Sequence, residues 1–225
     1  MKTPFRTAVL AIVSKDLRAE IRSRELLSVM AIFAFLCILV FSFALELDRV
    51  AREEAISGVL WVTLVFASLL GFNRSLAQEG DQGNLDAMLL APVSRPAIFL
   101  GKLLSNYLFT LIVALVILPL MTVIYNSNLL RGWLIVTTVV GVFGFSSIGT
   151  LLAMMTLHTR SREAMLPIAM LPVALPLLLT AVRASTNLLN DSPTREWLVW
   201  LQLLAAVTVI YLALCWLLSG FVLEE

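Results

Sequence analysis

Residues 79–102 read EGDQGNLDAMLLAPVSRPAIFLGK and separate two long apolar stretches of the chain. The segment begins polar, becomes amphipathic and passes two prolines before it turns apolar again. Its glycines permit tight turns, and its prolines oppose a continuous helix. A segment that only joined two apolar stretches would not need this combination of glycines, acidic residues and prolines.

The apolar stretches on either side are long enough to cross a membrane. The chain has 225 residues, of which 60% are hydrophobic and 14% charged, and its mean hydropathy is +0.96. A soluble domain needs less apolar surface than this, and about 20 apolar residues cross a bilayer core of ~30 Å. Six windows qualify: 26–45, 56–76, 98–125, 133–157, 164–182 and 197–222. The sequence therefore predicts an all-α, polytopic membrane protein with six transmembrane helices.

The distribution of positive charge predicts how these helices are oriented. Cytoplasmic segments of membrane proteins are enriched in Lys and Arg. With the N-terminus inside, the inner segments carry eleven of the 16 Lys and Arg residues. The other five lie in the outer loops: Arg49, Arg52, Arg131, Arg183 and Arg195. Both termini are therefore expected on the inner side.

Residues 1–25 form a separate unit ahead of the transmembrane domain, which we place at 26–225. Six apolar residues fall near one helical stripe, and the basic residues fall elsewhere. The stripe comprises Phe5, Val9, Ile12, Val13, Leu17 and Ile21. This pattern predicts a helix lying in the cytoplasmic interface. It is either an orientation anchor or an elbow helix that also helps to hold a partner.

The inner connecting segment, residues 77–97, predicts a short amphipathic helix. Asn84 is a possible N-cap, and Pro92 would end the helix. An exposed apolar face must be buried, and the nearby acids make an anionic membrane surface a poor host. A groove on a partner protein is the better host. The candidate contact residues are Glu79, Asp81, Gly83, Leu85, Asp86, Met88, Leu89 and Pro92. The alternative is a well-ordered connector between helices.

No catalytic or metal-binding constellation is visible in the sequence, so the chain is not expected to be an enzyme. His158 is the only histidine, and no ligating partner lies near it in the sequence. Pro96 stands where a P-loop ending at Gly101 and Lys102 would need its first glycine. The net charge of +1 gives no reason to expect a nucleic-acid partner. Any energy for transport would therefore come from another subunit.

Two spans carry residues that set how they pack. The fifth contains Pro167, Pro172 and Pro176, which predict a kinked or discontinuous helix. This helix would be either a bent structural element or a moving gate. In the fourth span, small residues predict close helix packing. They are Gly144, Ser146, Ser147 and Gly149.

Two stretches resemble a known family of membrane proteins. The segment FNRSLAQEGDQGNLDAMLLAPVSRPAIFLGK, residues 72–102, is similar to the strongest segment of the cytochrome c maturation protein B family (CcmB, heme exporter protein B). The span LPIAMLPVALPLLL, residues 166–179, resembles that family's proline-containing span. The chain length and the N-terminal KDLRAEIRSRE also suit it, so the resemblance covers essentially the whole chain. The implied fold is that of an ABC-2-type permease.

The resemblance implies a permease subunit for cytochrome c biogenesis in the bacterial cytoplasmic (inner) membrane. A separate ATPase subunit (CcmA-like) would bind ATP and Mg, and the segment from Glu79 to Pro92 would dock on it. The other implied partners are a heme-handling membrane protein (CcmC-like), a small helper (CcmD-like) and a heme chaperone (CcmE-like). The complex would handle heme, this chain would bind no cofactor itself, and a second permease copy would complete the pathway.

Two rival functions fit the same features. One is an ABC-2-type exporter permease for a lipid, a polysaccharide or a drug. The other is a non-conducting membrane scaffold that holds the ATPase near its heme-handling partner.

Overall fold

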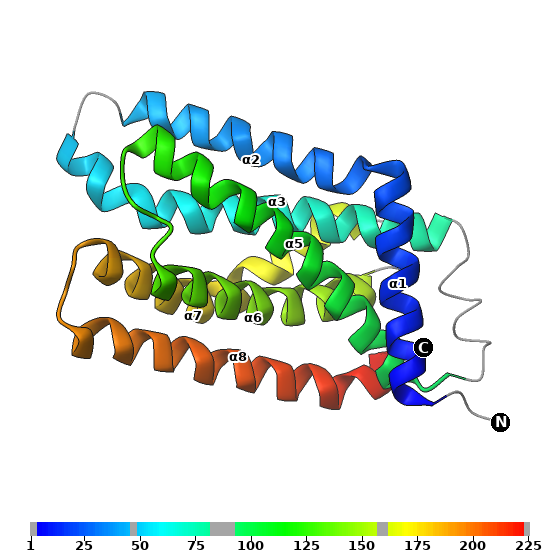
Figure 1. Ribbon diagram of the computed structural model, residues 1–225. Coiled ribbons are helices and arrows are strands. Elements are labelled where there is room, and N and C mark those ends of the chain that lie inside the picture. Colours follow the sequence, from blue (N-terminus) through cyan, green and yellow to red (C-terminus); the bar gives the residue numbers. More distant parts are fainter. Residues whose placement is uncertain (1–3, 46–48, 82–92, 157–161, 223–225) are drawn as a thin grey trace.

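The computed structural model describes residues 4–45, 49–81, 93–156 and 162–222, and within these ranges the chain is helical, without strands. Seven helices are present in the described residues (Figure 1). In chain order they are α1 (Phe5–Ser23), α2 (Glu25–Ala44), α3 (Arg49–Asp81), α5 (Arg95–Tyr125), α6 (Gly132–Thr156), α7 (Arg162–Leu189) and α8 (Thr194–Val222).

Six of the described helices are long and apolar enough to cross a membrane, which confirms the predicted class. The spans are Glu25–Ala44, Glu54–Ser75, Arg95–Tyr125, Gly132–Thr156, Ala164–Leu189 and Thr194–Ser219. They agree with the predicted windows to within a few residues, except that the fifth continues past residue 182. Helix α5 has 31 residues and is about 46 Å long at ~1.5 Å per residue. It exceeds the bilayer core, and it runs obliquely to its neighbours (Figure 1).

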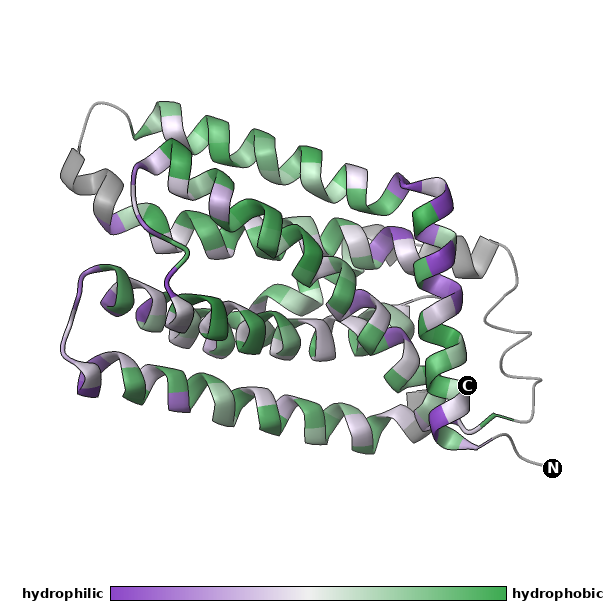
Figure 2. Cartoon of the chain, viewed as in Figure 1, coloured by the Kyte–Doolittle hydropathy of each residue, from purple (hydrophilic) through white to green (hydrophobic). Residues whose placement is uncertain are grey.

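Helices α3 and α6 form the interior of the bundle. The spans of both are 72% buried, whereas the α2 span is 22% buried. Helix α6 packs against α3, α5, α7 and α8, and α2 packs mainly on α3 and α5. Hydrophobic residues cover the sides of the bundle, and hydrophilic residues gather on α1 and at the helix ends (Figure 2). This distribution suits a bundle whose sides face lipid.

Small residues let the inner helices approach closely, as predicted for the fourth span. A Cβ atom on Gly144 would lie 2.4 Å from Leu177 Cδ1, and one on Gly149 would lie 2.3 Å from Phe72 Cε2. Distances this short are not found in real packing, so a larger residue at either position would have to displace its neighbour. The two residues hold α6 against α7 and α3.

Helix α7 continues from Arg162 to Leu189 although three prolines lie inside it. The discontinuous form of the fifth span is therefore not observed, and the kink at Pro167, Pro172 and Pro176 stays a prediction. Neighbouring side chains bond to carbonyls in this region: Tyr211 Oη donates to the Val173 oxygen, and Thr180 Oγ1 donates to the Pro176 oxygen at 3.0 Å. Neither oxygen is one that a proline frees, since those belong to residues four positions before each proline, so these bonds add to the contacts of α7 without replacing the ones its prolines remove.

An ion pair ties the connections at the outer end of the bundle. Arg131, before α6, donates to Asp191, between α7 and α8, and also to the Leu188 oxygen at 2.6 Å. The hydrogen bond from Arg131 holds the pKa of Asp191 below its usual value. Asp191 itself is exposed, so the pair adds little stability and mainly orients the connections.

Candidate coupling site

The two predicted contact residues that the structure describes fall at the end of the bundle that the charge distribution places inside, which we call the inner end. Glu79 and Asp81 lie in the last turn of α3, which continues as helix through Gly80. The other six lie outside the described residues: Gly83, Leu85, Asp86, Met88, Leu89 and Pro92. Helix α3 ends and α5 begins at the inner end, beside α1 (Figure 1). A partner docked on residues 77–97 would therefore lie close to α1.

Helix α1 crosses the inner end and packs closely on the first turns of α5. Ala8 and Val9 form a small apolar cluster with Ala97. One turn further along, Ile12 lies directly over Gly101, where an added Cβ atom would be only 2.9 Å from Ile12 Cβ and Cγ2. The glycine is therefore what allows the two helices to touch here.

A buried ion pair locks the same contact. Lys102 Nζ donates to Asp16 Oδ1 at 3.0 Å and to Oδ2 at 2.9 Å, with side chains only 1% and 7% exposed. Removing one partner of such a pair costs about 3–5 kcal/mol, because the other charge is left buried. The pair thus fixes where α1 crosses α5.

A second acid on the buried face of α1 holds the start of α2. The Glu20 carboxylate accepts hydrogen bonds from the Leu27 amide at 2.8 Å and the Leu26 amide at 3.3 Å. The first amides of a helix lack partners within it, and the helix dipole favours a negative charge there. Arg24 joins the two helices in the left-handed conformation, with φ of 55°, and forms the elbow. Helix α1 is thus attached to both α2 and α5.

A further ion pair brings α3 into the same junction. Arg74, near the inner end of α3, donates to Glu25 at the start of α2 at 2.6 Å. Both side chains are about half exposed, so this pair contributes less than the buried one. We define the inner junction as the contacts Asp16–Lys102, Ile12–Gly101, Glu20–α2 and Glu25–Arg74. It joins α1, α2, α3 and α5 at the inner end of the bundle.

The residues of the apolar stripe predicted for α1 differ in how far the rest of the protein covers them, and the place of α1 in the membrane interface stays a prediction. Val9 and Ile12 are buried, but Phe5 is 39% exposed and Ile21 is 71% exposed. The buried face instead follows a spacing of four residues: Ala8, Ile12, Asp16 and Glu20. Acids on the inward face were missed because a charged residue is normally assigned to solvent.

Lys102 was also missed, since it was counted only as one more inner cation. Its signal was its place in the 98–125 apolar window, where a lysine needs a partner. The sequence could not supply that partner, because Asp16 lies 86 residues earlier in the chain.

A groove between α2, α3 and α7 also opens toward the inner end. Its volume is about 510 Å³, and Phe33, Phe66, Asn73, Arg74 and Pro167 are among its lining residues. The groove therefore brings one of the predicted α7 prolines next to the Arg74 side of the junction.

Comparison with known proteins gives a consistent result. The family model described as CcmB protein matches residues 7–223. Heme exporter protein B of Rhodobacter capsulatus is 26% identical over 209 residues, which cover 91% of this chain and 93% of that protein. The protein of the same name from Paracoccus denitrificans is 25% identical over 206 residues, with the same coverage. That from Haemophilus influenzae is 24% identical over 174 residues, covering 76% of this chain and 78% of that protein.

Proposed function

This chain belongs to the CcmB protein family, and from that premise we propose that it is the membrane permease subunit of an ABC transporter complex for cytochrome c biogenesis. The observation that carries the proposal is the family match over residues 7–223 on a bundle with six membrane-spanning helices. Its relatives are named heme exporter protein B. The complex would couple ATP hydrolysis to heme delivery and to release of the heme-loaded periplasmic chaperone.

In the proposed complex, another subunit binds and hydrolyses ATP. A CcmA-like ATPase would bind ATP and Mg at the cytoplasmic face of the inner membrane. CcmC-like and CcmD-like membrane proteins and the CcmE-like chaperone would handle heme beside this subunit. A second copy of this permease would complete the assembly.

The inner junction gives this proposal a mechanical basis. Residues 82–92 connect α3 to α5, and Lys102 lies in the second turn of α5. A displacement of this connection by the ATPase would move α5 first, and the Asp16–Lys102 pair would transmit the movement to α1. The Glu20 contact would pass the movement to α2. Motion of one cytoplasmic segment would thus be shared by three helices.

Co-purification from native membranes tests the proposal. Replacing Leu85 or Met88 with Asp puts a charge on the apolar face expected to contact the ATPase. We expect either variant to lose most of the co-purifying ATPase, because burying an unpaired carboxylate in a groove is costly.

The matched control is Leu130→Asp, which changes an exposed leucine in the connection between α5 and α6, at the opposite end of the bundle. This variant should retain the ATPase. Wild-type amounts of ATPase with the Leu85 and Met88 variants would contradict the proposed docking segment. A different set of co-purifying proteins, without heme-handling partners, would contradict the role in cytochrome c biogenesis.

A further inference from the structure

A cavity opens on the membrane-facing side of the elbow between α1 and α2. Its volume is about 460 Å³, and its walls come from the elbow, the start of α2 and the middle of α5. Arg24 and Ser28 provide polar groups at its inner end, and Ala31, Val113 and Val116 form its apolar end. The cavity is therefore polar at one end and apolar at the other.

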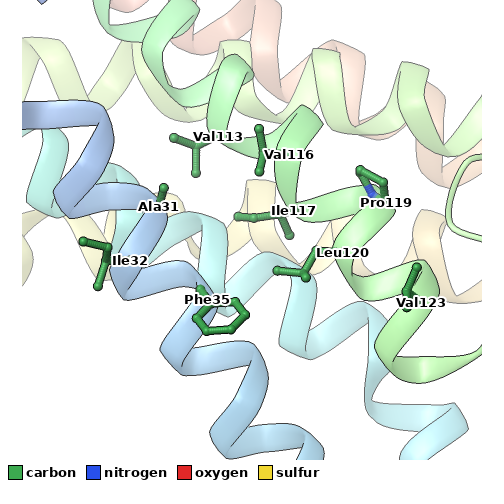
Figure 3. Close-up of a pocket in the computed structure, with 9 residues that line it drawn as sticks. All are labelled: Ala31, Ile32, Phe35, Val113, Val116, Ile117, Pro119, Leu120 and Val123. Atoms are coloured by element: carbon green, nitrogen blue, oxygen red, sulfur yellow. The ribbon is translucent and has the colours of Figure 1, made fainter. Parts of the chain in front are cut away.

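A second cavity continues from the apolar end, between α2 and α5. Its volume is about 650 Å³, and it shares Ala31, Val113 and Val116 with the first. All its lining residues are apolar. They come from α2 on one side and from α5 on the other, with Phe35 and Val123 toward the outer end (Figure 3). The two cavities together form one continuous groove, which we call the α2–α5 groove.

The length of this groove matches one leaflet of a bilayer. Arg24 and Phe35 are eleven residues apart, which is about 16 Å along a helix at ~1.5 Å per residue. One leaflet occupies about half of a hydrocarbon core of ~30 Å. The groove thus places its polar end near the headgroups of the inner leaflet and its apolar end near the bilayer midplane.

The charges around the polar end favour an anion. Glu20 lines the cavity, but its carboxylate is committed to the amides of Leu26 and Leu27. Arg24 is exposed, and its guanidinium pairs with no carboxylate in the part of the chain that the structure describes. Arg18 and Arg22 are also exposed on α1, whereas both acids of that helix are buried. Glu25, the exposed acid next to Arg24, is neutralised by Arg74 at 2.6 Å. The net charge on the surface of the elbow is therefore positive.

We propose that the α2–α5 groove binds an anionic phospholipid, with its phosphate held by Arg24 and Ser28 and one acyl chain lying between α2 and α5. A charged end followed by a purely apolar channel of one-leaflet length fits this molecule. The proposal requires only the membrane-spanning bundle, so it stands apart from the proposed role in heme delivery.

Lipid binding to the purified full-length chain in detergent tests this site. The probes are phosphatidylglycerol and phosphatidylcholine with identical acyl chains, and bound lipid is counted by native mass spectrometry. We expect the wild-type protein to bind phosphatidylglycerol more tightly. Arg24→Gln should weaken that binding about tenfold, which corresponds to the loss of one charge-assisted hydrogen bond. It should weaken phosphatidylcholine binding less, because the choline ammonium already offsets the phosphate charge of that lipid, so the preference between the two lipids should shrink.

Two further changes separate a defined site from general attraction. Arg18→Gln removes an exposed cation from α1, close to Arg24 in the sequence but outside the groove, so it should leave the preference intact. Ala31→Phe fills the groove and should reduce binding of both lipids. Val116→Phe fills it from the opposite wall and should do the same, which covers the case in which one variant does not fold.

Two results would overturn the proposal. Equal weakening by Arg18→Gln and Arg24→Gln would mean that α1 attracts anionic lipids only through its total charge. If Ala31→Phe left the bound lipid unchanged and altered the number of protein chains per particle, the groove would be a protein interface instead.

Discussion

At the scale of single residues, the Asp16–Lys102 pair is the feature with the strictest geometric and electrostatic requirements. Both side chains are almost fully buried, although they lie in a small membrane protein with few charged residues. A buried ion pair is weak evidence for stability, since apolar residues of similar size often serve as well. Its geometry is specific, however, because two oxygens and one ammonium group define where two helices cross.

Replacing Lys102 with Met should therefore destabilise the protein strongly. Asp16 would remain buried with only the half-exposed Lys15, 3.4 Å away, as a cationic neighbour. We therefore expect a loss at the lower end of about 3–5 kcal/mol in the free energy of unfolding. Denaturant titration of the purified protein in detergent measures this loss.

The double variant with Asp16→Leu and Lys102→Met is the control. It removes both charges, so most of the lost stability should return. A double variant as unstable as Lys102→Met alone would show that the pairing of charges is not what Lys102 provides.

At the scale of helices, two glycines with different surroundings test how the bundle is packed. A Cβ atom on Gly141 in α6 would lie 2.2 Å from Trp61 Cη2. Trp61 cannot move aside easily, because its ring is buried and its Nε1 donates to Ser185 Oγ at 2.9 Å. Gly141→Ala should therefore cost about 1–3 kcal/mol, as overpacked cores do.

Gly58→Ala in α3 is the matched control, since nothing lies within 4 Å of the added carbon. Alanine favours a helix over glycine by about 0.5–1 kcal/mol, so this variant should be neutral or more stable. Thermal unfolding of both variants in the same detergent provides the comparison. A destabilised Gly58→Ala together with an unaffected Gly141→Ala would contradict the observed contact between α3 and α6.

The helices themselves were predictable because their signal is local. Length and hydropathy located six spans to within a few residues at most boundaries. Which face of a helix is buried depends on contacts with other helices, so neighbouring residues in the sequence do not determine it. For α1 the apolar pattern selected Phe5 and Ile21, whereas the structure buries Asp16 and Glu20, whose partners lie on other helices.

At the scale of the whole molecule, a change in the inner junction can test the proposed coupling of ATP hydrolysis separately from docking of the ATPase. Gly101→Val should push Ile12 away and loosen α1 from α5, because even a Cβ atom is too close there. Residues 77–92 are unchanged in this variant. We therefore expect the ATPase to co-purify normally, while ATP hydrolysis no longer drives release of the heme chaperone.

Chaperone release and ATPase co-purification, measured on the same membranes, test this prediction. Leu85→Asp serves as the contrasting variant, since it should lose the ATPase itself. Normal chaperone release by a folded Gly101→Val protein would mean that α1 does not transmit the movement.

The sequence by itself determined the class of the protein, the six spans, the expected orientation and the segment proposed to meet the ATPase. These follow from hydropathy, charge and turn residues that lie next to one another in the chain. Only the tertiary structure decided that Asp16 meets Lys102, that Ile12 needs Gly101, and that α2 and α5 leave a groove beside Arg24. Each of these depends on how helices that are distant in the sequence cross. The crossing is determined by side-chain packing between them, which cannot be predicted from a local sequence pattern.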